Sequence, residues 1–340
     1  MINVSCNYPV LYPASIIGGM LIVDDNNGYE ILQADTNSFE WGKPNRLFVL
    51  SDSTNGIPKN IDLVWLSITE ERFYSIRSEI SASKIAKAFN TGFDYIIVGM
   101  APFGKIAIWL LGDSKSVLID WLIGESLDVD FNAVFQDGEY ETLQSLCQSI
   151  LSENTDAQQN LETNGLPPRD LFDNYMRQFT YRYLPLFEHW DKNEEKWTKY
   201  SEEEKEKTPE FDYIEEALYD GTHDKLHDGG LMKYHEAGKP KKLAVQWHVK
   251  KSEYSAYFWF EDEEIRAAFD RFYGPHPDTK TDFIIHIDCE KNKYEPALYR
   301  YGLKEPVIIN ESAYQLIVFK NKFECYRSEN YNQPRGAWIW

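Results

Sequence analysis

The sequence predicts an α+β fold that consists of two duplicated strand–strand–helix–strand–strand (ββαββ) units with mainly antiparallel sheets, joined by a partly helical acidic connector. Three observations support this prediction. Apolar residues first alternate with a period of two, as in half-buried strands, and then recur at the i, i+3, i+4 spacing of one helical face. The same succession occurs twice, about 180 residues apart. The aromatic share of 15% and the many β-branched residues also favour strands.

The first two strands of each unit are predicted from alternating patterns. Residues 61–65 and residues 243–247 alternate with period two, and each segment ends in a tryptophan on its apolar face. A second strand follows each of them, over residues 73–80 in the first unit and residues 254–260 in the second. The paired segments indicate one hairpin in each unit.

The period then changes, which predicts one helix in each unit. Ser81 precedes the first helix and is predicted to cap it. The apolar positions of both helices have the spacing of a single face that packs on a sheet. These positions are Ile85, Ala88 and Phe89 in the first unit and Ile265, Ala268 and Phe269 in the second.

Each unit closes with two short apolar strands, so that its helix is expected to cover one face of its own sheet. The strands are predicted at residues 94–98 and 106–111, and at residues 282–286 and 296–301. Three regions follow from this interpretation: a first repeat half, a connector and a second repeat half, at residues 1–135, 136–237 and 238–340.

The predicted connector contains three kinds of sequence. Apolar residues at helical spacing predict a helix over residues 143–151, and residues 152–164 are polar and predict a loop. Asp170 is predicted to cap a second helix. Residues 192–207 alternate acids and lysines, which is typical of a solvated helix or a loop.

The cysteines and the apolar segments predict a cytoplasmic protein. The four cysteines, Cys6, Cys147, Cys289 and Cys325, lie far apart, without a CxxC pair, and are interpreted as buried reduced thiols. The first residues lack the positive and apolar regions of a secretory signal. No apolar run approaches the length of a membrane span.

The charge of the chain is concentrated in its middle. The formal net charge is −20, and residues 116–168 contain ten acids without any lysine or arginine. Residues 188–237 contain sixteen acids and seven lysines, a net charge of −9. Nucleic acids and anionic membranes are therefore not expected as partners, because phosphate binding requires clustered lysine and arginine.

Two segments superficially resemble ligand sites. His223 and His227 would share a helix face at the i, i+4 spacing of metal ligands, but the glycines around residues 223–228 favour a polar loop, and no metal is predicted. Residues 99–105 contain glycines and a lysine but lack the spacing of a phosphate-binding loop. A tight hairpin turn is the preferred interpretation, and no cofactor is predicted.

No catalytic residues are predicted. The chain has no GxSxG motif, and none of its cysteines has a neighbouring histidine in the sequence. The tryptophans within alternating strands, Trp65, Trp109 and Trp247, are predicted to lie in the core. Trp41 and Trp338 lie in less regular sequence and are alternative candidates for a partner surface.

Several of these segments resemble the bacterial family named domain of unknown function 2931. The resemblance rests on residues 61–65, Phe73-Tyr74, Val98-Gly99-Met100-Ala101-Pro102 and residues 106–111. It continues through Leu166-Pro167-Pro168, Tyr175, residues 181–183, residues 243–247 and residues 265–269, and covers residues 8–319. It implies no established activity and no catalytic residues. Family members resemble accessory proteins, some encoded near secretion or toxin loci, and many begin with a lipoprotein signal that this chain lacks.

The leading hypothesis is a non-enzymatic immunity protein that neutralises a cognate toxin, of a type VI secretion or polymorphic system, through an acidic surface. A concentrated acidic surface attracts a basic partner and accelerates association. The alternatives are a structural or accessory interaction protein and, less favoured, a hydrolase. The candidate partner-binding acids are Asp128, Asp130, Asp137, Glu139, Glu141, Glu202, Glu203, Glu204, Glu210, Asp212, Glu215 and Glu216.

Overall fold

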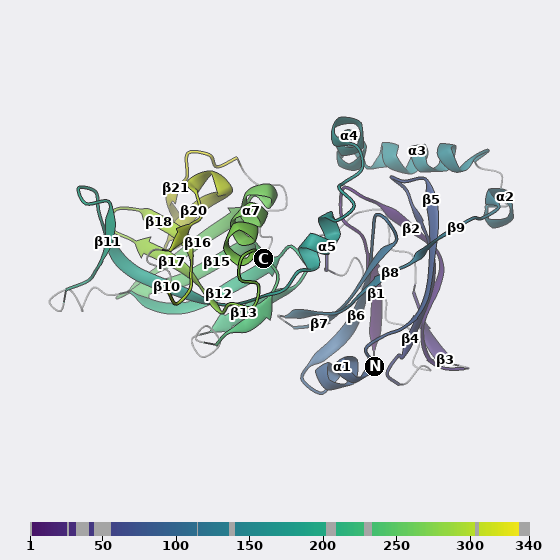
Figure 1. The fold of residues 1–340 in the computed structure, drawn as a ribbon, viewed down its shortest axis with the longest axis horizontal. Coiled ribbons are helices and arrows are strands. Elements are labelled where there is room, and N and C mark those ends of the chain that lie inside the picture. Colours follow the sequence, from purple (N-terminus) through teal and green to yellow (C-terminus); the bar gives the residue numbers. More distant parts are fainter. Residues whose placement is uncertain are drawn as a thin grey trace. The chain divides into compact units, whose positions relative to one another are not determined.

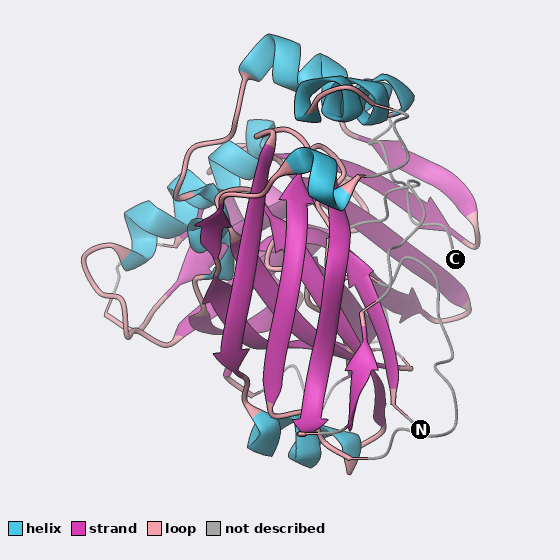
Figure 2. Cartoon of the chain, turned by 90° about the vertical axis from the view of Figure 1, so that its right-hand side faces the viewer, coloured by secondary structure: helices cyan, strands magenta, loops and turns pink. Residues whose placement is uncertain are grey.

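Strands make up most of the protein (Figure 2). A computed structural model describes residues 2–25, 27–31, 41–43, 56–113, 115–135, 140–201, 209–227, 233–302 and 306–332. The chain divides into two compact units. The first unit is Met1–Met176 with Asp220–Thr222, and the second is Arg177–Tyr219 with His223–Trp340.

The first unit contains two groups of paired strands. The group around β4, here called the β4 sheet, has the order β3-β2-β4-β5-β9. Its strands are β2 (Ala14–Asp24), β3 (Asn27–Glu30), β4 (Asn60–Ser67), β5 (Arg72–Glu79) and β9 (Glu125–Leu127). The group around β7, here called the β7 sheet, has the order β1-β6-β7-β8. Its strands are β1 (Asn3–Asn7), β6 (Phe93–Ala101), β7 (Lys105–Gly112) and β8 (Ser116–Ile123).

The β4 and β7 sheets enclose one apolar core, which makes the first unit a β-sandwich. Leu63 and Trp65 of the β4 sheet and Ile96 and Ile108 of the β7 sheet are fully buried in the same cluster. The helix α1 (Ala82–Phe89) runs between β5 and β6 and adds the buried Ile85 to this core. The unit is called the first sandwich below.

Short helices cover the outer surfaces of both sheets. Helix α3 (Leu143–Glu153) places Leu146 and Cys147 against buried residues of the β4 sheet, and α5 (Leu171–Met176) packs on Trp109 of the β7 sheet. The other helices in the described residues of the unit are α2 (Phe131–Val134) and α4 (Thr155–Asn164).

The second unit has the same kind of architecture (Figure 1). The strands around β15, the β15 sheet, follow the order β13-β12-β15-β16-β20-β21: β12 (Glu210–Leu218), β13 (His223–His227), β15 (Pro240–Val249), β16 (Ser252–Phe260), β20 (Tyr314–Lys320) and β21 (Phe323–Arg327). The β17 sheet has the order β11-β10-β17-β18-β19, with β14 also paired to β10. Its strands are β10 (Phe179–Asp191), β11 (Lys196–Lys199), β14 (His235–Ala237), β17 (Thr281–Asp288), β18 (Lys293–Tyr299) and β19 (Val307–Ile308).

An aromatic core holds these two sheets together. Trp247 and Phe258 of the β15 sheet and Tyr183 and Phe283 of the β17 sheet are fully buried in it. Helix α7 (Asp262–Tyr273) contributes five buried residues to the same cluster, while the 3₁₀ helix η2 (Glu311–Ala313) precedes β20. This unit is called the second sandwich.

The main strand pairings of the first sandwich recur in the second, which has β11, β14 and β21 in addition. Strand β2 of the first sandwich pairs with β3 and β4, and β12 of the second pairs in the same way with β13 and β15. Strand β5 of the first sandwich pairs with β9, and β16 of the second pairs with β20. The strand that begins each unit pairs in parallel with a distant strand, β1 with β6 and β10 with β17. The second sandwich thus repeats the pairing pattern of the first.

The predicted α+β fold class is wrong. The predicted strand–strand–helix–strand–strand succession occurs in the chain, but the two hairpins of each ββαββ segment enter different sheets. The hairpin β4–β5 belongs to the β4 sheet, whereas β6–β7 belongs to the β7 sheet, and α1 connects them. The helix therefore joins two layers of a sandwich instead of covering one small sheet.

Local predictions between the two repeats also need correction. Residues 155–164 form the helix α4, whose N-terminus is capped by the Asn154 side chain through Ala157 N at 3.1 Å, where a loop was expected. Residues 192–199 form the turn and second strand of the β10–β11 hairpin. Ser81 precedes α1, but its hydroxyl donates to Asp120 Oδ1 at 2.6 Å and makes no capping hydrogen bond. The chain divides near residue 176, because β10, β12 and β13 are strands of the second sandwich.

Candidate functional site

Strand β12 positions four of the predicted partner-binding acids. Glu210 is exposed, and Asp212 and Glu215 are half-buried. The pairing of β12 with β15 shifts register between Phe211 and Tyr213, which interrupts the simple alternation of faces along the strand. Glu216 is 3% exposed, so it does not lie on a surface.

Glu210 and Asp212 converge on one histidine. Nδ1 of His248 lies 3.1 Å from Asp212 Oδ1, and its Nε2 lies 3.1 Å from Glu210 Oε2. The hydrogen bond that His248 donates to Asp212 and the charges of both carboxylates raise the pKa of His248 above its usual value. This group at the protein surface keeps a net negative charge even when the imidazole is protonated, because two carboxylates face one histidine.

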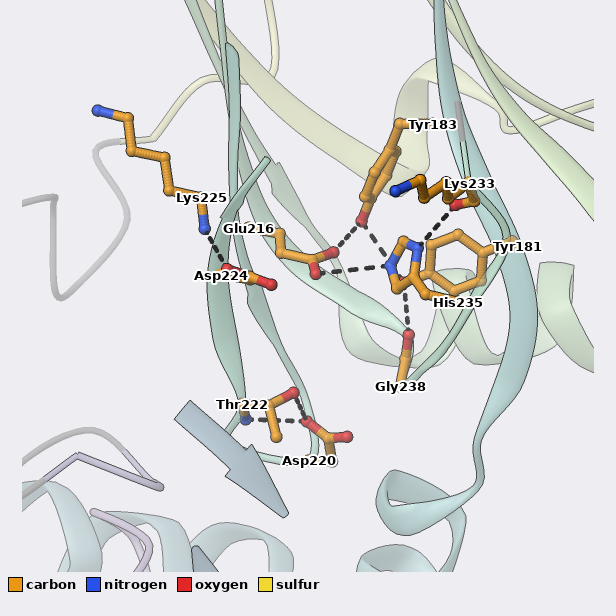
Figure 3. Close-up of polar contacts among 10 residues, drawn as sticks. All are labelled: Tyr181, Tyr183, Glu216, Asp220, Thr222, Asp224, Lys225, Lys233, His235 and Gly238. Atoms are coloured by element: carbon orange, nitrogen blue, oxygen red, sulfur yellow. Dashed lines mark hydrogen bonds and ion pairs between the residues drawn. The ribbon is translucent and has the colours of Figure 1, made fainter. Parts of the chain in front are cut away.

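Glu216 instead joins a buried polar network between the two sheets of the second sandwich (Figure 3). The Tyr183 hydroxyl donates to Glu216 Oε2 at 2.6 Å, and His235 Nε2 lies 3.8 Å from Glu216 Oε1. Tyr181 donates its hydroxyl to the Gly238 carbonyl at 2.8 Å. Burial, followed by the charge of Glu216, raises the pKa of Tyr183 well above its usual value. The network fixes β12 to β10.

The described predicted acids of the first sandwich are solvent-exposed. Asp128 and Glu141 are exposed, and Asp130 caps α2 by accepting from Asn132 N at 3.1 Å. Among the described residues, none of these three carboxylates forms an ion pair with lysine or arginine. The other predicted acids, Asp137, Glu139, Glu202, Glu203 and Glu204, lie outside the described residues.

The histidine segment of the sequence is a strand and not the expected polar loop. His223 and His227 lie at the two ends of β13, opposite Ala217 and Tyr213 of β12. Four residues of a strand span about 13 Å, far more than two ligands of one metal ion can be separated. Asp228 lies outside the described residues. Among the described residues, no group of three histidine, cysteine or acidic side chains has the arrangement of a metal site.

The glycine-containing segment at residues 99–105 is a hairpin turn, as predicted. Ala101 of β6 pairs with Lys105 of β7, and the turn residues Phe103 and Gly104 have φ of 64° and 74°. The Phe103 amide donates to Glu70 Oε2 at 2.9 Å, which fixes the turn.

The structure contains one buried histidine–carboxylate pair that the sequence did not predict. Nδ1 of His286 on β17 lies 2.7 Å from Glu188 Oε2 on β10. The Trp197 ring stacks on the imidazole, with ring centroids 4.9 Å apart and an angle of 14°. A histidine–carboxylate pair activates a nucleophile only when a hydroxyl or thiol lies beside the other ring nitrogen. No hydrogen bond of this kind is made by His286 in the part of the chain that the structure describes.

Cys147 and Cys289 do not provide such a nucleophile. Cys6 and Cys147 are buried as predicted, whereas Cys289 is half-buried and Cys325 is exposed. Burial raises the pKa of Cys147 and of Cys289 to about 12. These two thiols therefore stay protonated near neutral pH, whereas a nucleophilic cysteine needs its thiolate.

The tryptophans of the alternating strands are in the core, as predicted. Trp65, Trp109 and Trp247 are fully buried. Trp41, an alternative candidate for a partner surface, is only 9% exposed and packs edge-on against Trp109, with ring centroids 4.7 Å apart. Trp41 is therefore unsuited to a partner surface, and Trp338 lies outside the described residues.

In the described part of the chain, no helix combines the length and the apolar character needed to cross a bilayer.

Comparison with known proteins gives one match. Residues 3–168 match the model of a family described as "Protein of unknown function (DUF2931)". The match covers the segments of the first sandwich on which the resemblance rests and ends well before residue 319. No curated protein matches the chain, and no solved structure matches it.

Proposed function

Through residues 3–168 the chain belongs to the DUF2931 family, whose description gives no function, and from its charges we propose that it is a binding protein for a basic protein partner. The partner class that fits best is a cognate bacterial toxin, which makes this chain an immunity protein. Electrostatic attraction between a dense acidic surface and a basic surface accelerates association and favours the correct partner.

The observation that carries the proposal is that exposed acids are not neutralised within the protein. Asp128, Asp130 and Glu141 form no ion pair with lysine or arginine among the described residues, and Glu210 and Asp212 both contact the single imidazole of His248. Among the described residues, the charges of Asp128, Asp130 and Glu141 are not used in ion pairs with lysine or arginine, and repulsion between like charges opposes compactness. Attraction of a basic partner gives them a role.

The experiment begins with the wild-type protein immobilised at low salt and exposed to a lysate of its native host. Proteins eluted by salt are identified, and a basic one is purified for binding measurements. Charge reversal at Asp128, Glu141, Glu210 and Asp212 to lysine is expected to reduce its association rate about tenfold or more and to weaken the salt dependence of binding.

The control is Asp278→Lys, which reverses an exposed acid outside the acidic middle of the chain. It is expected to leave association nearly unchanged. If the fourfold reversal and the control have the same effect at low salt, the acidic-surface proposal is wrong. Circular dichroism of each variant ensures that the fold is intact.

A further inference from the structure

We propose that a small pocket of the first sandwich binds the carboxylate end of a polypeptide chain whose last residue is apolar. The pocket has a volume of about 290 Å³. Its lining residues come from the β6–β7 turn and the start of β7, the end of β8, and the segment before α5 together with α5 itself: Phe103, Lys105, Ile123, Arg169, Asp170 and Asp173. This inference is independent of the acidic surface and concerns a ligand of opposite charge.

The floor of the pocket is an ion pair between the buried Lys105 and the half-buried Asp173. Lys105 is 8% exposed, and its Nζ donates to both oxygens of Asp173 at 2.8 Å. Asp173 Oδ1 also accepts from Trp121 Nε1 at 2.9 Å. A lysine ammonium has three N–H donors, so Lys105 retains one beyond its two bonds to Asp173. An acceptor atom entering the pocket can use that donor.

The rim provides a second cation. Arg169 is exposed, and its guanidinium lies 5.3 Å from the Phe103 ring centroid. Among the described residues it forms no ion pair, and it is the first lysine or arginine after Lys115 in the sequence. A guanidinium recognises a carboxylate through two parallel hydrogen bonds, and stacking on an aromatic ring holds its plane in place.

The pocket also offers an apolar surface beside these cations. Ile123 is 62% exposed at the end of β8, and Phe103 is half-buried in a turn fixed by Glu70. If the carboxylate of a ligand contacts the two cations, an apolar side chain beside that carboxylate would cover Ile123 and Phe103. The combination favours the last residue of a chain that ends in leucine, isoleucine or valine.

The acids of the pocket restrict the ligand further. Asp170 accepts from Asn174 Nδ2 through Oδ2, and its other oxygen can accept an amide N–H of the incoming chain. Asp170 and Asp173 would repel a doubly charged phosphate more strongly than a single carboxylate. The volume is below the range of drug-sized ligand sites, which suits the end of a chain.

The test uses an acetylated Ala-Ala-Leu peptide with a free carboxylate, its C-terminal amide, and free acetate. Calorimetric titration of the full-length protein is expected to give binding of the acid peptide and at least about tenfold weaker binding of the amide. Arg169→Gln is expected to weaken binding of the acid peptide by about the same factor. Ile123→Ser is expected to remove the preference for a peptide that ends in leucine over one that ends in glycine.

Arg77→Gln is the matched control, because Arg77 is an exposed arginine of the same sandwich outside the pocket. Equal affinity for the acid and the amide, or equal effects of Arg169→Gln and Arg77→Gln, would overturn the proposal. Acetate binding as tightly as the peptide would also overturn it, since a small carboxylate would then be the ligand. Arg169 and Ile123 are exposed, so both variants are expected to fold, which thermal unfolding checks.

Discussion

Tyr183 and Glu216 connect the two sheets of the second sandwich by a hydrogen bond between buried side chains. Hydrogen bonds to a charged group inside a protein are among the stronger single polar contacts, and an acceptor that loses its donor there is destabilising. The neighbouring Tyr181 makes a bond to a neutral carbonyl group instead. The two tyrosines provide a matched comparison.

Tyr183→Phe is expected to lower the free energy of unfolding by about 1.5–3 kcal/mol, because it removes the donor to a buried carboxylate. Tyr181→Phe is expected to lower it by about 1 kcal/mol, because its acceptor is uncharged. Urea denaturation of both variants measures the difference. Equal losses would contradict the prediction that the hydrogen bond to Glu216 is the stronger of the two.

Lys239 predicts a pH dependence of stability. It is 1% exposed, and burial, followed by the charge of Arg177, lowers its pKa from 10.5 to about 8, with Asp270 and Asp262 opposing and Arg266 adding to the shift. Between these two values the unfolded chain holds a proton that the folded chain has released. Stability is therefore expected to rise with pH from about 8 to 10 relative to Lys239→Met.

The measurement is the free energy of unfolding of both proteins across this range. The tyrosines titrate alike in both proteins, so their contribution cancels in the comparison. Lys241→Met serves as the control, because Lys241 is half-buried and lies only two residues further along the chain, in β15. A difference that stays constant with pH would contradict the prediction.

Buried charges are the residues that the sequence could not place. Glu216 lies among other acids and Lys239 among other lysines, so both follow the pattern of a solvated surface. Their burial depends on partners in other strands, such as Tyr183, which has no fixed sequence distance from them. The core tryptophans could be predicted, because an alternating strand itself indicates which face is buried.

At the scale of elements, the β6–β7 turn requires glycine at one position. Gly104 has φ of 74°, and a Cβ there would lie 2.7 Å from the Gly124 carbonyl oxygen and 2.9 Å from the Tyr74 ring. Gly92 also has a positive φ, of 95°, but has open space around the corresponding position. A comparison of alanine variants at these two positions therefore separates the cost of backbone strain from the cost of steric overlap.

Gly92→Ala is expected to destabilise the protein by about 1–2 kcal/mol, from backbone strain alone. Gly104→Ala is expected to lose at least about 1 kcal/mol more, because the neighbouring backbone must move. Chemical denaturation gives both values. Similar losses would mean that the turn adjusts without strain.

Elements whose apolar residues recur at a regular spacing could be predicted from the sequence. Elements in charged or polar segments could not. Helices α1 and α7 follow from the spacing of Ile85 and Ile265 with their neighbours, and α3 follows in the same way. Residues 192–199 have a repeating charge pattern, which hid the β10–β11 hairpin and its half-buried Trp197. Helix α4 was missed because its sequence is polar, with Ala157 its buried residue.

At the scale of the whole molecule, the net charge of −20 predicts a stabilising effect of salt. Raising ionic strength from about 10 mM to 150 mM shortens the Debye length from about 30 Å to 8 Å and reduces repulsion between the acids. The melting temperature is expected to rise, by about 2 °C for each 1 kcal/mol gained.

The variant with lysine at positions 128, 141, 210 and 212 tests the cause. Each reversal adds two positive charges, so the net charge changes from −20 to about −12. Its melting temperature is expected to respond less to salt than that of the wild type, in scanning calorimetry. If salt raised the melting temperature of the variant and of the wild type equally, charge repulsion would not be the cause of the salt effect.

The fold class could not be predicted because a hairpin pattern does not reveal which sheet the hairpin enters. Both β4–β5 and β6–β7 are alternating or apolar pairs of strands, and either one sheet or two would bury them. The choice is set by partners such as β1 and β2, whose sequences precede the repeat pattern.

The parallel pairing of β1 with β6 has a consequence for synthesis on the ribosome. Asn3 pairs with Tyr95, so the first strand to emerge waits for more than ninety residues before its neighbour exists. Tyr181 likewise pairs with Thr281. Such nonlocal closure slows folding and leaves an edge open to wrong pairing meanwhile. Each nascent sandwich is thus most open to chaperones and to aggregation until its helix, α1 or α7, has been made and the strand after it arrives.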